Sequence, residues 1–137
     1  MDTVDRATRS RIMASVKGRN TDIEVLVFRE LRRQGIKFRK HYRQLPGTPD
    51  IAFPQMKVAV FIDGDFWHGY RYPAWRKKIK SAFWRNKIET NRLRDQRNFT
   101  LLRRNGWKVL RVWGHQVKGD LPKVVSTIII TTVKPRR

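Results

Sequence analysis

The sequence contains no cysteine and no apolar run long enough to cross a membrane. The lack of cysteine excludes a disulfide framework and a thiolate zinc site, and it is compatible with a reducing cytosol. The polar first residues, M-D-T-V-D-R-A-T-R-S-R, lack the apolar centre of a signal peptide. These absences predict a soluble, cytoplasmic protein.

Acidic residues are scarce relative to basic ones. The chain has 11 Asp and Glu against 32 Lys and Arg, which leaves a formal net charge of +21 on 137 residues. Such a surface attracts polyanions, and the basic residues are spread along the whole chain instead of lying on one amphipathic helix. We therefore expect a nucleic acid as the partner and no membrane association. The plainer alternatives are a ribosomal-type or architectural binder, or a membrane-surface protein.

Internal repeats and low-complexity linkers are also absent. A chain of this length buries roughly 68–70% of its unfolded surface, which is enough for a core without a metal or disulfide. We predict a single domain over residues 1–137. Residues 1–20 would form a basic N-terminal arm, and residues 21–137 would form the catalytic core.

Apolar spacing, caps and turn residues predict an alternation of helices and strands. A capping box at Thr21–Glu24 and a stop at Gly35 delimit the first helix. The last segment is β-branched, so helix and strand compete there, and we favour helix. The predicted elements are a helix over 22–34, extended segments at 37–42, 50–53 and 57–62 with a hairpin between the last two, a loop over 63–80, a helix from Ser81 to Asn105, a strand over 107–113 and a helix over 120–133.

Three of the 11 acidic residues lie in one short stretch. A turn, P-G-T-P-D, leads into apolar residues that end in F-I-D-G-D-F-W-H, which brings Asp50, Asp63 and Asp65 near His68. Carboxylates would repel the phosphates of a nucleic acid unless a divalent cation lies between them. Together with the basic surface, this pattern indicates a metal-dependent nuclease.

Helical phase singles out two further carboxylates. Glu24 lies at the edge of the apolar stripe of the first predicted helix. Asp95 lies in the middle of the apolar face of the second, with Trp84, Ile88, Phe99 and Leu102. Taken alone, a structural interpretation is favoured for each: Glu24 completes the capping box, and Asp95 pairs with an arginine such as Arg92 or Arg94.

Several sequence blocks occur in an order typical of one family. They are D-R-A-T-R-S, an early helix with Glu24, L-P-G-T-P-D, V-F-I-D-G-D-F-W-H, F-W-R-N-K-I followed by R-D, and G-W-K-V-L-R-V-W. Over roughly residues 5–118 the chain resembles the very-short-patch-repair (Vsr) mismatch endonucleases. The resemblance implies an α/β fold with a restriction-endonuclease-like core, a mixed β-sheet flanked by helices. It also implies Mg²⁺-dependent nicking of DNA beside a T:G mismatch in DNA repair, and we expect a monomer on DNA with repair proteins as further partners.

The resemblance also implies an active site. Its Glu, Asp, His, Asp constellation maps to Glu24, Asp50, His68 and Asp95. Asp50 and the backbone carbonyl of Ile62 would bind one or two Mg²⁺, with Asp63 as a further ligand. His68, with a pKa near the ordinary value of about 6.5, would accept a proton from the attacking water. Glu24 and Asp95 would hold metal-bound water and orient His68. Without the resemblance, a loop histidine bonded to backbone is the better interpretation of His68.

An aromatic pair next to this site suggests how a mismatch is recognised. In the family, the residues matched by Phe66 and Trp67 enter the base stack from the major groove, while a methionine matched by Met13 approaches from the minor groove. Unstacking costs less at a mispair, so insertion itself contributes selectivity. Arg9 and Arg11 would contact DNA from the same arm. The alternative is that Phe66 and Trp67 are core residues.

The chain departs from the family pattern at the positions of a structural zinc. These positions hold Asp65, Tyr70, Tyr72 and His115, of which only Asp65 and His115 suit a metal. We therefore expect no structural zinc, with aromatic packing in its place. Asp63 also stands where the family tends to have a second histidine, which makes the site more acidic.

Two other classes of function are compatible with the sequence. A sequence-specific homing or restriction-type endonuclease would use the same core. A non-catalytic DNA-binding module would keep the basic surface but would not need the inward-facing carboxylates. Dependence of cleavage on Mg²⁺ separates these two alternatives.

Overall fold

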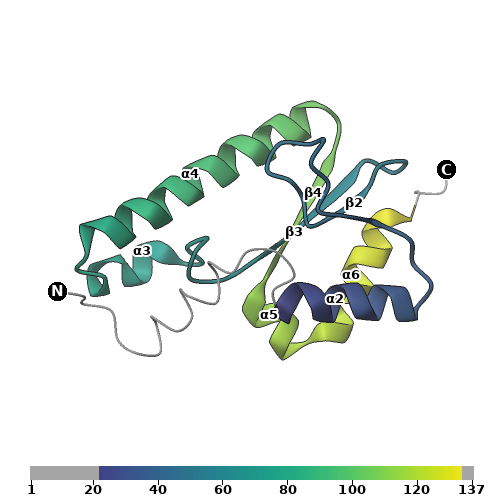
Figure 1. Cartoon of the computed structure of the whole chain (residues 1–137), viewed down its shortest axis with the longest axis horizontal. Coiled ribbons are helices and arrows are strands. Elements are labelled where there is room, and N and C mark those ends of the chain that lie inside the picture. Colours follow the sequence, from purple (N-terminus) through teal and green to yellow (C-terminus); the bar gives the residue numbers. More distant parts are fainter. Residues whose placement is uncertain (1–21, 134–137) are drawn as a thin grey trace.

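A four-stranded sheet in the order β1-β2-β3-β4 forms the centre of the computed structural model, which describes residues 22–133 (Figure 1). The strands are β1 (Arg39–Lys40), β2 (Ile51–Phe53), β3 (Val58–Asp63) and β4 (Lys108–Trp113). β1, β2 and β3 pair antiparallel, whereas β3 and β4 pair parallel. The sheet is therefore mixed, as predicted, and the predicted hairpin joins β2 to β3.

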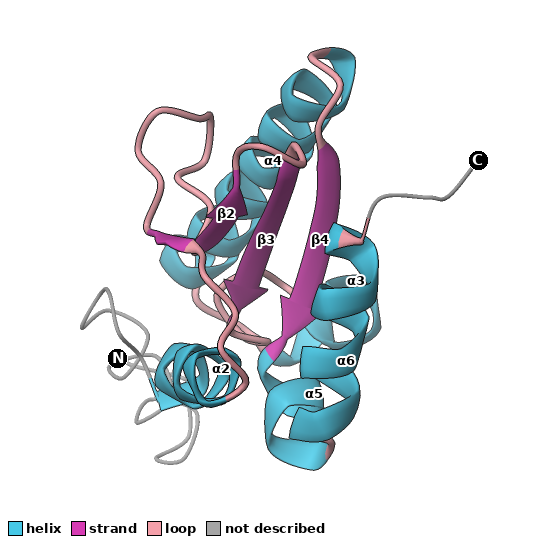
Figure 2. Cartoon of the chain, turned by 90° about the vertical axis from the view of Figure 1, so that its right-hand side faces the viewer, coloured by secondary structure: helices cyan, strands magenta, loops and turns pink. Residues whose placement is uncertain are grey.

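Helices cover both faces of this sheet (Figure 2). α2 (Asp22–Arg33), α5 (Gly114–Gly119) and α6 (Leu121–Thr132) lie on one face, and α4 (Ala82–Arg104) lies on the other. All six residues of β3 are buried, because both of its faces meet helices.

The alternation of side chains along β3 separates two cores. Val58, Val60 and Ile62 pack in the cluster with α2, α5 and α6, whereas Ala59 and Phe61 pack against Phe99 and Leu102 of α4. Continuing this alternation by one step directs Asp63, the last residue of the strand, toward α4. The first carboxylate of the candidate site is placed by the strand itself.

The long helix follows its predicted limits closely. The Ser81 side chain caps α4 by accepting a hydrogen bond from the Trp84 amide at 3.4 Å, and Gly106 follows the helix with φ of 82°. A left-handed residue at this place ends a helix, and glycine adopts it without strain. Ile88, Phe99 and Leu102 are buried on one face, which confirms the predicted phase.

Two segments differ from the sequence prediction. The predicted loop over residues 63–80 contains a short helix, α3 (Tyr72–Trp75), and a 3₁₀ turn, η1 (Arg76–Lys78). Tyr72 is buried in a cluster with Ile79 and Ile88, so these turns are stabilised by tertiary packing and not by a local pattern. Helix α5 was also not predicted.

The helix favoured near the C-terminus is present. α6 begins after Asp120, whose side chain accepts a hydrogen bond from the Lys123 amide at 3.1 Å. Burial of Val124, Val125 and Ile128 against the core decides the competition between helix and strand. No helix within residues 22–133 has the length and apolar character needed to cross a membrane.

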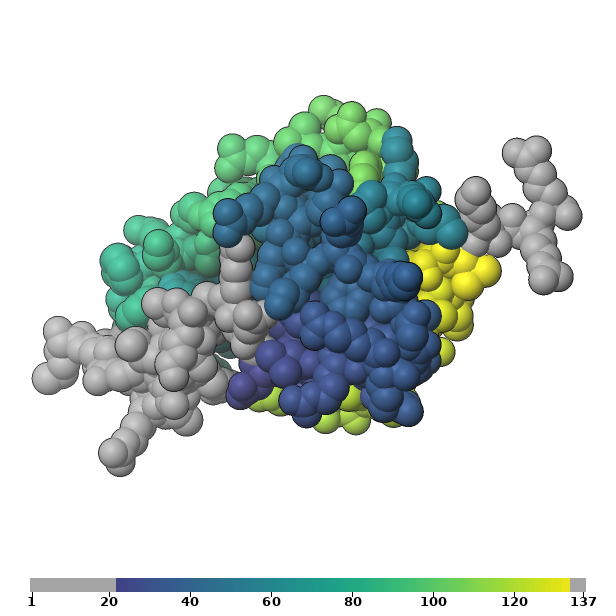
Figure 3. Space-filling view, turned by 45° about the vertical axis from the view of Figure 1, so that its right-hand side comes forward, coloured from purple at the N-terminus to yellow at the C-terminus, as the bar shows by residue number. Residues whose placement is uncertain are grey.

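The face around α2 carries the segment that leads into β2. In the space-filling view, the purple and blue atoms of α2 and of the following residues up to β2 form one continuous surface (Figure 3). The predicted first helix is confirmed at 22–33, while the Thr21 cap and the arm over residues 1–20 lie outside the described residues.

Candidate active site

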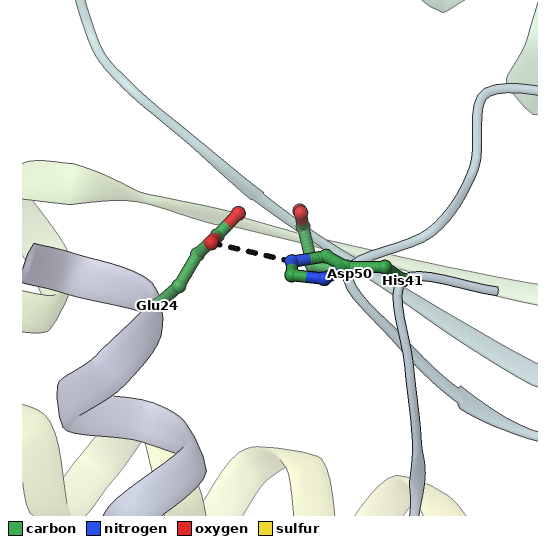
Figure 4. Close-up of side chains that lie close together, drawn as sticks. All are labelled: Glu24, His41 and Asp50. Atoms are coloured by element: carbon green, nitrogen blue, oxygen red, sulfur yellow. Dashed lines mark hydrogen bonds and ion pairs between the residues drawn. The ribbon is translucent and has the colours of Figure 1, made fainter. Parts of the chain in front are cut away.

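The first cluster of ligand-type side chains joins α2 to the start of β2. Glu24 lies in the first turn of α2, Asp50 directly precedes β2, and His41 lies in the connection between them (Figure 4). The ligand atoms of the three residues all lie within 4.8 Å of one another. The His41 Nε2 atom is 3.4 Å from Glu24 Oε2, and both side chains are at most 10% exposed.

Backbone hydrogen bonds bring His41 beside Asp50. The His41 amide donates to the Asp50 carbonyl at 3.0 Å, and the Tyr42 amide donates to the Pro49 carbonyl at 2.9 Å. These bonds close the loop of residues 42–49 at its base. His41 has φ of 49°, a left-handed conformation that is uncommon for a non-glycine residue and clusters at functional sites.

Asp50 is anchored to the neighbouring strand. Its Oδ2 atom accepts a hydrogen bond from the Ile62 amide at 2.6 Å. The resemblance implies that Asp50 and the Ile62 carbonyl bind the same metal ion, and this role of the carbonyl stays a prediction. The structure adds a direct hydrogen bond from the Ile62 amide. This bond fixes the orientation of the carboxylate, which leaves its second oxygen for another contact.

The charge of Asp50 is poorly compensated. Burial raises the pKa of its carboxyl to about 9, and the hydrogen bond to Glu24 and the charges of Glu24 and Asp63 act in the same direction against the Ile62 amide. Among residues 22–133, Asp50 forms no ion pair with a lysine or arginine. In the absence of a bound metal ion, Asp50 therefore retains its proton near neutral pH.

The second cluster of ligand-type side chains lies where β3 ends. It consists of Asp63 at the end of β3, His68 in the following loop and Asp95 on α4, with ligand atoms within 4.8 Å of one another. His68 Nδ1 is 2.7 Å from Asp95 Oδ2, and its Nε2 is 3.6 Å from Asp63 Oδ1. Both imidazole nitrogens thus face a carboxylate.

Arg111 of β4 completes this second cluster. Its Nε donates to Asp63 Oδ2 at 2.9 Å, and its Nη2 donates to Asp95 Oδ2 at 2.7 Å. Asp95 therefore pairs with an arginine, as the structural interpretation expected, but the arginine is Arg111 and not Arg92 or Arg94. Asp95 faces the sheet, so its partners come from β4 and the β3 loop and not from its own helix.

The carboxylates around His68 change its acid strength. Burial lowers the pKa of His68, but the hydrogen bond to Asp95 and the negative charges of Asp63 and Asp95 outweigh burial and raise it above its ordinary value. Burial also raises the pKa of Asp63, against the favourable charges of His68 and Arg111. The expectation of a pKa near that of free imidazole is wrong for this form of the protein.

The two clusters adjoin through β3. Asp50 binds the Ile62 amide, and the next residue along the strand is Asp63, whose charge acts on Asp50. Glu24, Asp50, His68 and Asp95 therefore lie around one end of β3 instead of on unrelated faces. They come from α2, the start of β2, the β3 loop and α4, so only the folded chain brings them together.

The aromatic pair packs within the protein. Phe66 stacks on Trp75 with ring centroids 5.5 Å apart, and Trp67 lies 5.8 Å from the ring of Trp84. Both side chains are half-buried against a core cluster. By contrast, Phe83 is 62% exposed. This packing fits the alternative of core residues, and insertion of the pair into DNA stays a prediction.

The positions of the family zinc are filled by packed side chains. Asp65 Oδ2 is 3.0 Å from His115 Nδ1, and the Tyr70 ring lies 4.4 Å from the His115 ring and 5.0 Å from that of Trp113. Tyr72 is buried and hydrogen-bonds to Glu89. Aromatic packing is present where it was expected, and the absence of zinc stays a prediction.

His41 and Arg111 were not predicted from the sequence. Arg111 is a charged residue within the apolar strand V-L-R-V-W, which is a usable signal for an inward-facing cation. His41 has no such signal, because its position depends on how the following loop closes. The proposed DNA contacts Arg9, Arg11 and Met13 lie outside the described residues.

Comparison with known proteins identifies the family. Residues 1–74 match the family described as DNA mismatch endonuclease Vsr. The chain is 41% identical over 120 residues to the Type II nicking enzyme V.HpaIIP of Haemophilus parainfluenzae, a match that covers 85% of each protein. It is 40% identical over 113 residues to the Type II nicking enzyme V.XorIIP of Xanthomonas oryzae, covering 82% of this chain and 83% of that one. It is 37% identical over 123 residues to the DNA mismatch endonuclease Vsr of Escherichia coli, covering 86% and 76%. The mixed sheet, the clustered carboxylates and these matches together show that the chain belongs to the Vsr family, and that it is a DNA endonuclease with a restriction-endonuclease-like fold.

Proposed function

We propose that this protein nicks one strand of double-stranded DNA beside a T:G mismatch, using Mg²⁺, as a step in DNA repair. The observation that carries the proposal is the convergence of Glu24, Asp50, His68 and Asp95 at one end of β3. The net charge of +21 attracts DNA, but carboxylates repel its phosphates unless a divalent cation lies between the two.

The first cluster fits a hard divalent cation. Its carboxyls lie close together, and burial and the neighbouring Glu24 raise the pKa of Asp50, so a metal would replace a proton there. Asp50, Glu24 and the Ile62 carbonyl would hold the ion, directly or through water, with the charge of Asp63 nearby. When bound, Mg²⁺ supplies positive charge that neutralises the scissile phosphate and stabilises the leaving oxygen.

His68 would take the proton from the attacking water. Its Nδ1 is oriented by Asp95, so the neutral tautomer carries its proton on Nδ1 and leaves Nε2 as the acceptor. His68 must be neutral for this step, and its raised pKa means that the fraction in the active form grows with pH. Asp95 fixes the tautomer and stabilises the imidazolium that forms.

Recognition of the mismatch would use the aromatic pair and the arm. Phe66 and Trp67 would leave their contacts with Trp75 and Trp84 and enter the weakened base stack. Met13, Arg9 and Arg11 would approach from the other groove. In this proposal residues 1–137 act as one domain, as a monomer on DNA, at the nucleoid in the cytoplasm, and other repair proteins would be further partners.

A second candidate is sequence-specific nicking, because several relatives carry the name Type II nicking enzyme. It uses the same site and differs in what is recognised. Family membership as a DNA endonuclease removes the alternative of a non-catalytic DNA-binding module.

A cleavage assay tests the proposal. Supercoiled DNA and short duplexes, with either a T:G or a T:A pair in otherwise identical sequence, are incubated with the protein and Mg²⁺ or EDTA. We expect nicking that needs Mg²⁺ and the T:G pair. Asp50→Ala and His68→Ala should bind DNA and fail to cleave, whereas the surface control Glu30→Gln and the histidine control His115→Ala should cleave.

The outcomes separate the candidates. Equal cleavage of T:G and T:A duplexes would favour sequence-specific nicking. Cleavage by Asp50→Ala at the wild-type rate would remove the proposed metal site, and cleavage in EDTA would remove the metal requirement.

A further inference from the structure

A basic groove lies along β1, the edge strand of the sheet. It has a volume of about 450 Å³ and is lined by one residue of α2 and by residues 36–40. Four of these six side chains are cationic and none is acidic. The cations are Arg32, Lys37, Arg39 and Lys40, and all four are exposed. The groove belongs to the surface that α2 and the following residues form in Figure 3.

The positive charge of this groove is not neutralised by carboxylates. Within residues 22–133, none of its four cations forms an ion pair. The next residue of α2 differs, because Arg33 pairs with Glu30 outside the groove. Cations gathered around one cavity repel one another, and an anion in the groove would relieve that repulsion.

Two stacked rings hold the groove cations in place. The rings of Phe28 and Phe38 have their centroids 5.6 Å apart. The central guanidinium carbon of Arg32 lies 5.5 Å from the Phe38 centroid, and Lys40 Nζ lies 5.5 Å from the Phe28 centroid. A cation over a ring keeps N–H donors for another partner. The rings therefore order two phosphate-type donors in advance, which lowers the entropic cost of binding an anion.

The same rings connect the groove to the first cluster of the candidate active site. The Phe28 and His41 rings meet edge to face with centroids 5.8 Å apart, and Lys40 directly precedes His41 in the chain. The four steps from Lys37 to His41 span at most about 14 Å. This length equals roughly four base steps of duplex DNA at about 3.4 Å each. A strand with its scissile phosphate at the cluster can therefore place neighbouring phosphates in the groove.

We propose that this groove binds the phosphate backbone of the DNA on one side of the cut, with Arg32 and Lys40 as the main contacts. Arginine and lysine donors match phosphate oxygens in charge and in hydrogen bonding. Backbone contacts of this kind fix the position of a duplex without reading its sequence, so they would hold the scissile bond in register with Asp50. The inference uses the DNA endonuclease activity of the family and takes the position of the cut from the proposed function.

The salt dependence of DNA binding tests this inference. The full chain is mixed in EDTA with a labelled duplex, and fluorescence anisotropy gives the dissociation constant at several NaCl concentrations. The double variant Arg32→Gln, Lys40→Gln should lose about tenfold or more in affinity at about 0.1 M salt. Its slope of log K against log salt should be shallower by about 1.8, the value for two phosphates. The loss should be equal for T:G and T:A duplexes, because backbone contacts carry no sequence information.

Two matched double variants serve as controls. Arg104→Gln, Lys108→Gln removes the same charge at the opposite edge of the sheet, where Lys108 begins β4. Its affinity should stay within about twofold of wild type, because distant exposed charges are screened. Arg32→Lys, Lys40→Arg preserves the charge and should preserve the slope. Circular dichroism confirms that each variant is folded.

Neutral phosphates locate the contact on the DNA. Methylphosphonate linkages, which carry no charge, are placed one at a time on either side of the cut, whose position is read from the length of the cleavage products. We expect a neutral linkage within about half a helical turn of the cut, about five base pairs, to weaken binding by wild type. The same linkage should not weaken binding by Arg32→Gln, Lys40→Gln any further.

Two results would overturn the inference. One is a groove variant whose affinity and salt slope match those of the Arg104 and Lys108 control, which would leave the groove to an acidic partner protein. The other is a set of sensitive phosphates that is the same for wild type and the groove variant. The salt slopes are measured without metal, so they decide the role of the groove even if Asp50→Ala cleaves at the wild-type rate and the proposed metal site is lost.

Discussion

The two acidic clusters at the end of β3 differ in how their charge is compensated. In the cluster of Glu24, His41 and Asp50, burial and the neighbouring carboxylates raise the pKa of Asp50, which favours a proton or an added cation at that carboxyl. In the cluster of Asp63, His68 and Asp95, an arginine and the histidine itself supply the positive charge. The difference in charge compensation fits the proposed division of tasks, in which the first cluster binds a cation and the second moves a proton.

The largest expected effect comes from the first cluster. Asp50→Asn removes the buried charge that holds the cation, and a lost metal contact costs several kcal/mol of transition-state stabilisation. We expect cleavage to fall on the order of 10³-fold or more, measured as the single-turnover rate at saturating Mg²⁺. Glu30→Gln on the same helix as Glu24 should change the rate less than about twofold, as a surface position. Comparable losses in both variants would show that the first cluster has no special role.

The second cluster should show a smaller loss and a change in pH dependence. His68→Ala should lower the rate by about 10²–10⁴-fold, and Asp95→Asn by about 10–100-fold. Because Asp95 helps to raise the pKa of His68, Asp95→Asn should also move the acidic limb of the pH–rate profile to lower pH. A limb that stays in place, with His68 intact, would contradict the assignment of that limb to His68.

Stability of the metal-free protein should depend on pH through the first cluster. The pKa of Asp50 is raised in the folded state to about 9, so its contribution to stability is complete below the unfolded value of about 3.9 and is lost as the pH rises toward 9. We expect the melting temperature in EDTA to fall from pH 6 to pH 9, and Asp50→Asn to flatten this fall. At pH 8 the variant should be more stable than wild type by about 1–3 kcal/mol. Thermal melts that show a parallel decline in both proteins would contradict the proposed pKa.

The smallest effect is expected from the aromatic neighbours of the second cluster. Trp67→Ala removes the ring contact with Trp84, which contributes about 0.5–1.5 kcal/mol beyond area burial. If Trp67 also enters the DNA, the ratio of the T:G to the T:A cleavage rate should fall. A loss of stability alone would lower both rates and leave their ratio unchanged. Phe83→Ala, which removes an exposed ring, is the control. A loss of stability with an unchanged cleavage ratio would leave Trp67 a packing residue only.

Local signals explain how much of this fold was predictable. The Ser81 cap, the stop at Gly106 and the apolar phase of Ile88 and Phe99 were enough to place α4 and to turn Asp95 inward. Short turns such as α3 were missed because burial of Tyr72 by distant residues stabilises them.

The candidate site was predictable only in part, for a related reason. Helical phase and the family resemblance identified Glu24 and Asp95, but the partner of Asp95 is set by the register of β4 beside β3, which spacing in the sequence does not reveal. The position of Arg111 in the site is set by that register. The position of His41 is set by the hydrogen bonds that close the loop before Asp50.

The hairpin between β2 and β3 has a consequence for how much length variation the chain can tolerate. The register pairs Ile51 with Val60, and the bond from the Ile62 amide to Asp50 depends on it. Inserting one residue into the turn at Pro54–Lys57 would slide one strand along the other and rotate the acidic side chain to the wrong side of the sheet. We therefore expect this turn to tolerate neither insertions nor deletions, even though most of it is exposed and it lies at the opposite end of β3 from Asp63.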